Sequence, residues 1–184
     1  MITRSEIESC RGQEIDSADT DALKARMATL RASRQPLFLT ASEFDDILQW
    51  KLGQQIGRQR AKRAANTDEL IRQVTGLALS LHHADKTYET ELRLAILCAL
   101  RGVAVPVASA VLALVFPEQY AVIDFRVWHC LFGEDMTVFS IRDYHRYMSK
   151  LVPIALELGW PVQEVDHAIW EHDRRSGRTA SGKP

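Results

Sequence analysis

Apolar residues recur at three- and four-residue spacing along most of this chain, and this helical period limits its possible folds more than any other feature. No alternation of apolar and polar residues lasts long enough between turn residues to predict a strand. We therefore expect an all-α protein. The expected helices cover residues 20–32, 41–52, 54–65, 68–82, 87–100, 105–116, 125–132, 140–158 and 162–174.

The length of 184 residues suits one compact unit with a single sizeable core. Helical periodicity is weak and the composition is polar at both ends of the chain. We therefore expect flexible extensions at residues 1–18 and 176–184, flanking a single helical unit at residues 19–175. We expect the protein to be a monomer.

Composition and charge limit the cell compartment and the binding partners that we expect for this protein. The formal net charge is −1, so attraction to nucleic acid has to come from a local basic face. Three widely spaced cysteines and the absence of a secretory leader favour a reducing cytoplasm. The longest apolar run is too short to cross a bilayer, and the histidine spacings do not suit a metal. We expect a cytoplasmic protein without membrane, metal or cofactor.

A sharp interruption stands between two apolar helical segments, in "LRGVAVPVASAVL" at residues 100–112. Gly102 can adopt the backbone conformation that a tight turn between helices requires. The helix that follows begins with unpaired N–H groups and the positive end of its dipole, which together suit a phosphate oxygen. The candidate DNA-backbone contacts are Arg101, Gly102, Val103 and Ala104. An ordinary corner between two helices would explain the same turn.

The segment "FPEQYAVIDFRVWHCLFG" then brings a short irregular link to the start of another helix. Together, "LRGVAVPVA" and "VIDFRVW" resemble the helix-hairpin-helix DNA glycosylase superfamily, in which a hairpin "LPGVGxKxA" precedes a "VDxxVxR"-like segment with the catalytic aspartate. Pro106 lies 18 residues before Asp124, about the interval in that family. The resemblance is best over residues 40–175, with the hairpin at about 87–116.

This resemblance implies an all-α fold with a cleft between helical layers, and removal of a damaged or modified base from double-stranded DNA. The chain looks like a small bacterial member without an iron-sulfur cluster. Two residues depart from the family pattern: Ala104 stands at the second hairpin glycine, and Pro106 at the hairpin lysine. Proline cannot form a Schiff base, so we expect a monofunctional glycosylase without lysine-dependent lyase activity. Pro106 also suits the first turn of a helix.

Asp124 is the candidate catalytic residue. Breaking an N-glycosidic bond develops positive charge on the sugar, and a fixed carboxylate near that sugar stabilises the transition state. Asp124 directly precedes Phe125, so it is also a good N-cap for the next helix, and a cap role alone would explain it. Arg126, beside this carboxylate, is a further candidate DNA contact.

A base that leaves the duplex needs a pocket with an aromatic or apolar wall. The aromatic candidates are Trp50, Trp128, Trp170 and Tyr144, with Trp50 favoured because it adjoins Lys51 near a helix end. The expected pocket comprises Trp50, Lys51, Trp128 and Tyr144. Large aromatic residues of small helical proteins more often lie in the core.

Two other classes of function remain open from the sequence. Ala104, Pro106 and the near-neutral charge favour a non-catalytic helix-hairpin-helix module that binds DNA or a protein. The other class is a helical scaffold in which the hairpin is only a corner between two helices. Basic residues are densest at 58–63, where a solvated helix surface explains them as well as DNA contact does.

Overall fold

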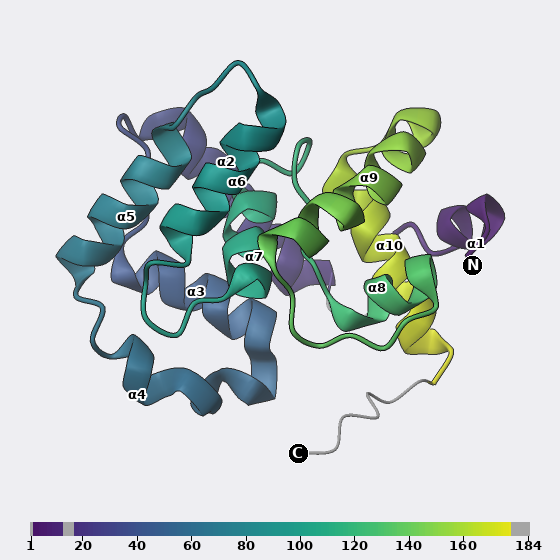
Figure 1. Ribbon diagram of the computed structural model, residues 1–184, viewed down its shortest axis with the longest axis horizontal. Helices are drawn as coiled ribbons and strands as arrows, with labels where there is room; N and C mark the ends of the chain where they lie inside the picture. The colour runs from purple at the N-terminus through teal and green to yellow at the C-terminus, as the bar shows by residue number, and fades with distance from the viewer. Residues whose placement is uncertain (1, 13–16, 178–184) are drawn as a thin grey trace.

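The computed structural model describes residues 2–12 and 17–177, and all regular secondary structure within these ranges is helical (Figure 1). This confirms the all-α expectation. The helices are α1 (Arg4–Ser9), α2 (Ser17–Ser33), α3 (Ala41–Leu52), the 3-10 helix η1 (Gly53–Gln59), α4 (Arg60–Arg63), α5 (Asp68–Ser80), α6 (Lys86–Leu97), α7 (Val105–Val115), α8 (Phe125–Phe132), α9 (Ile141–Leu158) and α10 (Val162–Arg175).

Local capping chemistry explains why most helices begin close to their predicted starts. The hydroxyl groups of Thr40, Thr67 and Ser140 each accept a hydrogen bond from a backbone N–H in the first turn of α3, α5 and α9. Gly133 and Gly159 end α8 and α9 in the left-handed conformation. These signals depend on neighbouring residues only, which is why the sequence reveals them.

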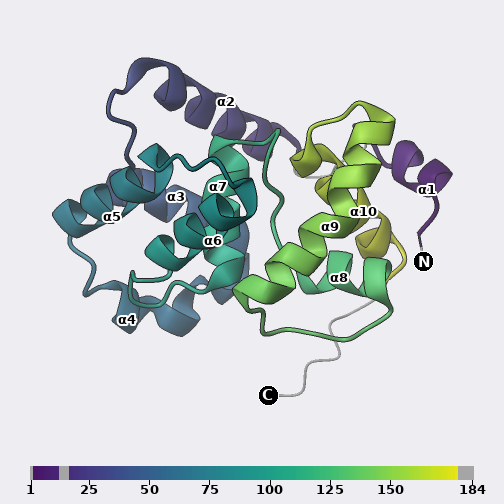
Figure 2. The ribbon, with the colours of Figure 1, turned by 45° about the horizontal axis from the view of Figure 1, so that its top comes forward.

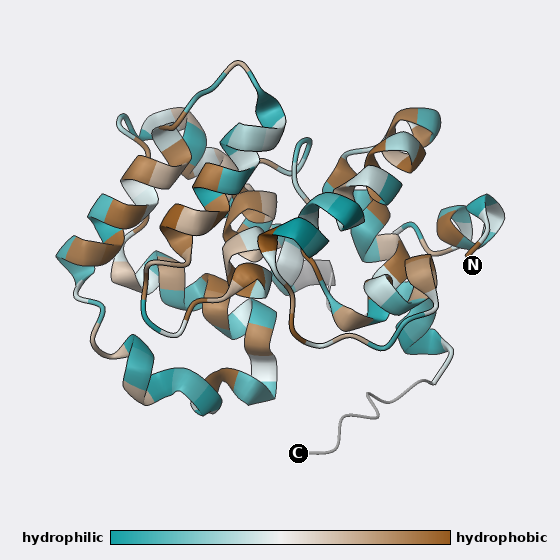
Figure 3. Cartoon of the chain, viewed as in Figure 1, coloured by the Kyte–Doolittle hydropathy of each residue, from teal (hydrophilic) through white to brown (hydrophobic). Residues whose placement is uncertain are grey.

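The helices form two groups, visible in both ribbon views (Figures 1 and 2). In the first, α2, α3 and α6 pack against α7, and α5 packs against α3 and α6. In the second, α10 packs against α1, α8 and α9. Every residue of α7 except Pro106 is buried, so α7 is the central helix of the first group. Figure 3 shows the corresponding contrast between hydrophobic α7 and hydrophilic α4.

The N-terminal segment differs from the flexible extension that the sequence predicts for residues 1–18. Helix α1 packs on α10, and its residue Ile7 and its C-cap residue Cys10 are buried. Arg11 lies over the ring of Trp160 and pairs with Glu164 on α10. The apolar pair of α1 spans a single turn, too short to stand out as a periodic pattern. Residues 1, 13–16 and 178–184, including most of the predicted C-terminal tail, lie outside the described residues.

The predicted helix at residues 54–65 is the other local difference, because the chain forms η1 and then the four-residue α4 there. No residue of η1 or α4 is buried. Gly53 has a φ of 48°, which interrupts the end of α3. Without an apolar face to pack, this stretch has little tertiary stabilisation for a regular helix.

None of the helices within the described ranges combines the length and the apolar character needed to cross a lipid bilayer.

Candidate functional site

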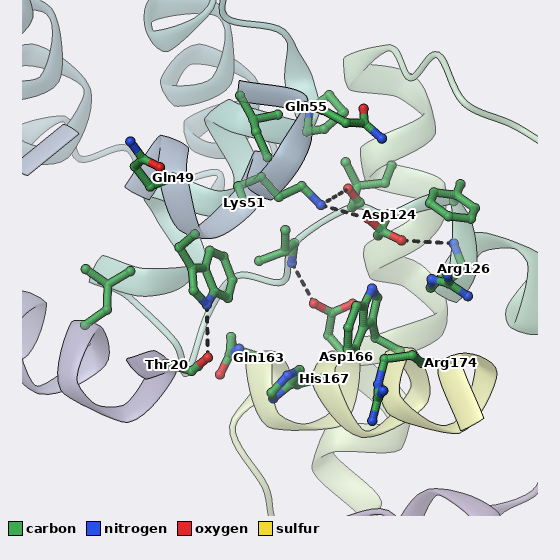
Figure 4. Close-up of a pocket in the computed structure, with 18 of the residues that line it drawn as sticks. Thr20, Gln49, Lys51, Gln55, Asp124, Arg126, Gln163, Asp166, His167 and Arg174 are labelled. Atoms are coloured by element: carbon green, nitrogen blue, oxygen red, sulfur yellow. Dashed lines mark hydrogen bonds and ion pairs between the residues drawn. The ribbon is translucent and has the colours of Figure 1, made fainter. Parts of the chain in front are cut away.

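A cleft with a volume of about 1430 Å³ lies between the two groups of helices. One wall comes from α2, α3, η1 and the first turn of α7, and the other from residues 122–126, the approach to α9, and α10. Figure 4 shows its central part. The distant sequence segments that build this cleft meet only in the tertiary structure.

Asp124 lies in this cleft and also caps α8. Its Oδ1 accepts a hydrogen bond from the backbone N–H of Arg126 at 3.0 Å. Its Oδ2 accepts one from Nζ of Lys51 at 2.9 Å, and 18% of the Asp124 side chain remains exposed. The cap role and the cleft location therefore hold together: the carboxylate is fixed at a helix start and still reachable from the cleft.

Lys51 reaches Asp124 from the last turn of α3, on the opposite wall (Figure 4). Its Nζ also lies 3.5 Å from the carbonyl oxygen of Ile123, and only 11% of its side chain is exposed. The sequence places Lys51 in the pocket but gives no sign of this pairing, because 73 residues separate the two partners. Lys51 and the N-terminal end of α8 surround the carboxylate with positive charge.

The extended residues before Asp124 are anchored by buried polar groups. The backbone N–H of Val122 donates to Oδ2 of Asp166 at 2.9 Å, and that of Ile123 donates to Oγ of Ser109 at 3.1 Å. The hydroxyl of Tyr147 contacts both Oδ1 of Asp166 and the carbonyl oxygen of Val122. This short segment is therefore held to α7, α9 and α10, which fixes where Asp124 points.

Asp166 is the titratable group of the site that sequence reasoning missed. Burial raises its pKa to about 7, although hydrogen bonds from Tyr147 and the Val122 N–H oppose the shift. Below that pH the carboxyl is neutral and its O–H can donate a hydrogen bond to the hydroxyl of Tyr147, which then donates to the carbonyl oxygen of Val122. The signal in the sequence was an acid on the apolar stripe of α10, next to Val165 and three residues before Ile169.

Of the predicted aromatic wall, Trp50 lies in the cleft, half-buried, with its indole N–H donating to Oγ1 of Thr20 at 3.0 Å. Trp170 lines the cleft as well. Trp128 and Tyr144 do not: both are fully buried in the core.

The placement of Trp128 and Tyr144 corrects the predicted pocket. Trp128 packs against Phe132 and Phe139, one helical turn deeper than the cap residue of α8. The hydroxyl of Tyr144 donates to the carbonyl oxygen of Ala121 at 3.0 Å, so it supports the anchored segment from behind. Helical spacing from Asp124 indicates a shared face, but it does not distinguish the cleft edge from the core beneath it.

The hairpin turn forms at Gly102, whose φ is +74°. Asn66 clamps it: its Nδ2 donates to the carbonyl oxygen of Arg101 at 2.9 Å, and its Oδ1 accepts from the Arg101 N–H at 3.0 Å. The side chain of Arg63 covers Gly102, and Val103 is buried. Of the four predicted DNA contacts in the turn, Arg101 and Ala104 are exposed.

Replacing Gly102 by Ala should destabilise the fold more than the same change at Gly133. Both glycines have nearly equal positive φ, which costs an L-residue about 1 kcal/mol. A Cβ at Gly102 would also lie 2.8 Å from Cγ of Arg63, whereas a Cβ at Gly133 meets nothing within 4 Å. Urea denaturation of the two variants measures the difference; equal losses would mean that the packing of α4 on the hairpin does not stabilise the fold.

Arg126, a predicted DNA contact, lines the cleft and also joins two helices. Its guanidinium pairs with the buried carboxylate of Asp173 at 3.0 Å and lies over the ring of Phe125. The pair joins α8 to α10 across one end of the cleft. Arg58, from the basic stretch at 58–63, also lines the cleft.

The described residues hold no group of three or more histidine, cysteine, aspartate or glutamate side chains placed to bind a metal ion. Comparison with protein-family models, curated proteins and solved structures gave no match to this chain.

Proposed function

We propose that this protein is a monofunctional DNA glycosylase, which draws an altered base out of double-stranded DNA into the cleft and hydrolyses its N-glycosidic bond. The observation that carries the proposal is Asp124: a carboxylate fixed at a helix start, partly exposed, inside a cleft with an indole wall. The resemblance of "LRGVAVPVA" and "VIDFRVW" to helix-hairpin-helix glycosylases points to the same residue.

The geometry suits the chemistry at each step. The cleft, at about 1430 Å³, is larger than a typical small-molecule pocket, so it has room for a nucleotide that is still part of a chain. As the base departs, the sugar gains positive charge, and Asp124 stabilises it and orients a water molecule for attack at C1′. Trp50 offers a flat face for the extruded base.

The position of Lys51 favours a second candidate reaction. Its amine lies beside Asp124, although the hairpin position used by lysine in the family is Pro106. After losing a proton, this amine could attack C1′ itself, so that a C–N bond forms as the base leaves with the bond electrons. One amine proton passes to the departing base, and the sugar ring then opens at the C1′–O4′ bond, with O4′ taking the other amine proton, to leave an imine. Borohydride reduces this imine to a stable protein–DNA adduct that Lys51→Met cannot form. For the monofunctional enzyme we expect no adduct in either protein.

The decisive experiment compares binding to a duplex that carries a cationic abasic-sugar analogue with binding to an unmodified duplex, at two salt concentrations. The analogue imitates the charge that develops on the sugar, and catalysts bind transition-state mimics preferentially. We expect a strong preference for the analogue in the wild type and loss of that preference in Asp124→Asn. Equal, salt-sensitive binding of both duplexes would instead identify a non-catalytic DNA-binding module. The absence of any DNA binding at low salt would leave a helical scaffold.

A further inference from the structure

Gln163 is a buried polar residue in the wall of the cleft. It lies in the first turn of α10, where its backbone N–H donates to the carbonyl oxygen of Pro117 at 3.1 Å. The residue is only 1% exposed, yet it lines the cleft. In Figure 4 its side chain lies between Thr20 and His167, and Thr20 accepts the hydrogen bond from the indole N–H of Trp50.

The side-chain amide of Gln163 has an unpaired hydrogen-bond acceptor. Its Oε1 is buried and has no hydrogen-bond partner among the residues that the structure describes. A buried acceptor without a donor is unfavourable, and most native structures avoid it. This acceptor is paired if a ligand in the cleft donates a hydrogen bond from an N–H group to it.

We propose that Gln163 reads the edge of the extruded base, and that this edge carries an N–H donor next to an acceptor. The inference rests on the proposed function, because it takes the ligand to be a nucleobase. A side-chain amide offers one acceptor and one donor side by side, which is why Asn and Gln pair in a bidentate manner with such edges. Trp50, which also lines the cleft and is hydrogen-bonded to Thr20, has an indole ring against which the base plane can lie.

Two kinds of base edge share this chemistry. An amidine edge, as in adenine, has an exocyclic amine beside a ring nitrogen, and a lactam edge, as in hypoxanthine, has a ring N–H beside a carbonyl oxygen. Methylation of the lactam ring nitrogen removes its N–H, and dimethylation of the exocyclic amine removes both N–H groups of the amidine edge. A site that depends on this hydrogen bond rejects the methylated base because Oε1 stays buried without a donor.

The test measures binding of four duplexes whose central nucleotide has 2′-fluorine, which resists cleavage. The central bases are adenine, N6,N6-dimethyladenine, hypoxanthine and N1-methylhypoxanthine, each opposite an abasic site so that extrusion breaks no base pair. In the wild type we expect one N–H-bearing base to bind about 10- to 100-fold more tightly than its methylated partner. The pair of bases that shows this difference in binding identifies whether the site recognises the amidine edge or the lactam edge.

The same four duplexes are measured with Gln163→Leu, which keeps the volume of the side chain but offers no acceptor. Added methyl groups also change size, so the contribution of Gln163 is the part of the preference that this variant loses. We expect the preference to fall below about threefold. An unchanged preference in the variant, or no preference for either N–H-bearing base in the wild type, would overturn the inference. Gln163→Met replaces the leucine variant if that one does not fold.

Failure of this inference and failure of the proposed function give different results. The cationic abasic analogue has no base, so Gln163→Leu should bind it as tightly as the wild type does. If the wild type itself shows no preference for that analogue, the glycosylase proposal fails. If the wild type prefers the analogue but Gln163→Leu leaves base preference unchanged, only the role of Gln163 fails.

Discussion

Replacing Asp124 by Asn should lower the rate of base release about 10²- to 10³-fold, the loss expected when one preorganised electrostatic contact to a transition state is removed. The amide keeps the shape of the carboxyl group and caps α8 nearly as well, but it cannot neutralise a cationic sugar. Single-turnover release of the base from a duplex substrate measures the effect. The duplex with the cationic analogue provides the matching binding measurement.

The change at Asp124 also breaks its ion pair with Lys51, so the pair needs a control of its own. Lys51→Met breaks the same pair and keeps the carboxylate. We expect the methionine variant to lose much less activity than Asp124→Asn in the monofunctional enzyme. An equal or larger loss in Lys51→Met, together with loss of borohydride trapping, would indicate that the amine attacks the sugar. Full activity in Asp124→Asn would contradict its catalytic role and leave it as a helix cap.

The free energy of unfolding should fall by about 2–3 kcal/mol between pH 5 and pH 8 because of Asp166 alone. Its pKa is raised from 3.8 to about 7 in the folded protein, so the folded state binds more protons than the unfolded state between these two values. Stability from this residue is therefore greatest at low pH and is lost as the pH rises. Above about pH 7 the whole cost, about 4 kcal/mol, is present.

Asp166→Asn isolates this contribution. An amide accepts from the Val122 N–H and donates to Tyr147, as the neutral carboxyl does, but it does not titrate in this range. The difference in unfolding free energy between the wild type and this variant should therefore widen as the pH rises from 5 to 8. Urea denaturation at several pH values measures it. A difference that does not depend on pH would mean that Asp166 stays ionised throughout.

Burial sets the direction of the pKa shift of Asp166, and its charged neighbours modify the shift. Lys51 favours the ionised form, whereas Asp124 and burial oppose it, and burial dominates. The hydrogen bonds that Asp166 accepts from Tyr147 and from the Val122 N–H also favour the ionised form, but they do not outweigh burial.

The fold class and most helix positions could be predicted because they depend on local information. The apolar period determines which segments become helices, and caps such as Ser140 and glycines such as Gly159 determine where they begin and end. The same rules fail where the local signal is weak. Helix α1 offers one apolar turn, and residues 53–63 offer no buried face.

The candidate site was only partly predictable. Asp124 has a local signature, since a cap directly before a helix identifies it and the hairpin motif precedes it at a known interval. Trp128 and Tyr144 have the right residue type for a pocket wall but lie in the core. The helical period gives the direction of a side chain around the axis of its helix. It does not say which part of the protein packs against that face of the helix.

By itself, the sequence of this protein determined an all-α chain, a hairpin turn at Gly102 and a carboxylate fixed at the start of α8. Each of these depends on residues within a few positions of one another. Only the tertiary structure decided that Lys51 pairs with Asp124, that Asp166 is buried behind it and that Gln163 faces the cleft. These groups lie on different helices, and their charge and hydrogen-bond energies depend on distance and burial, which exist once the helices have packed.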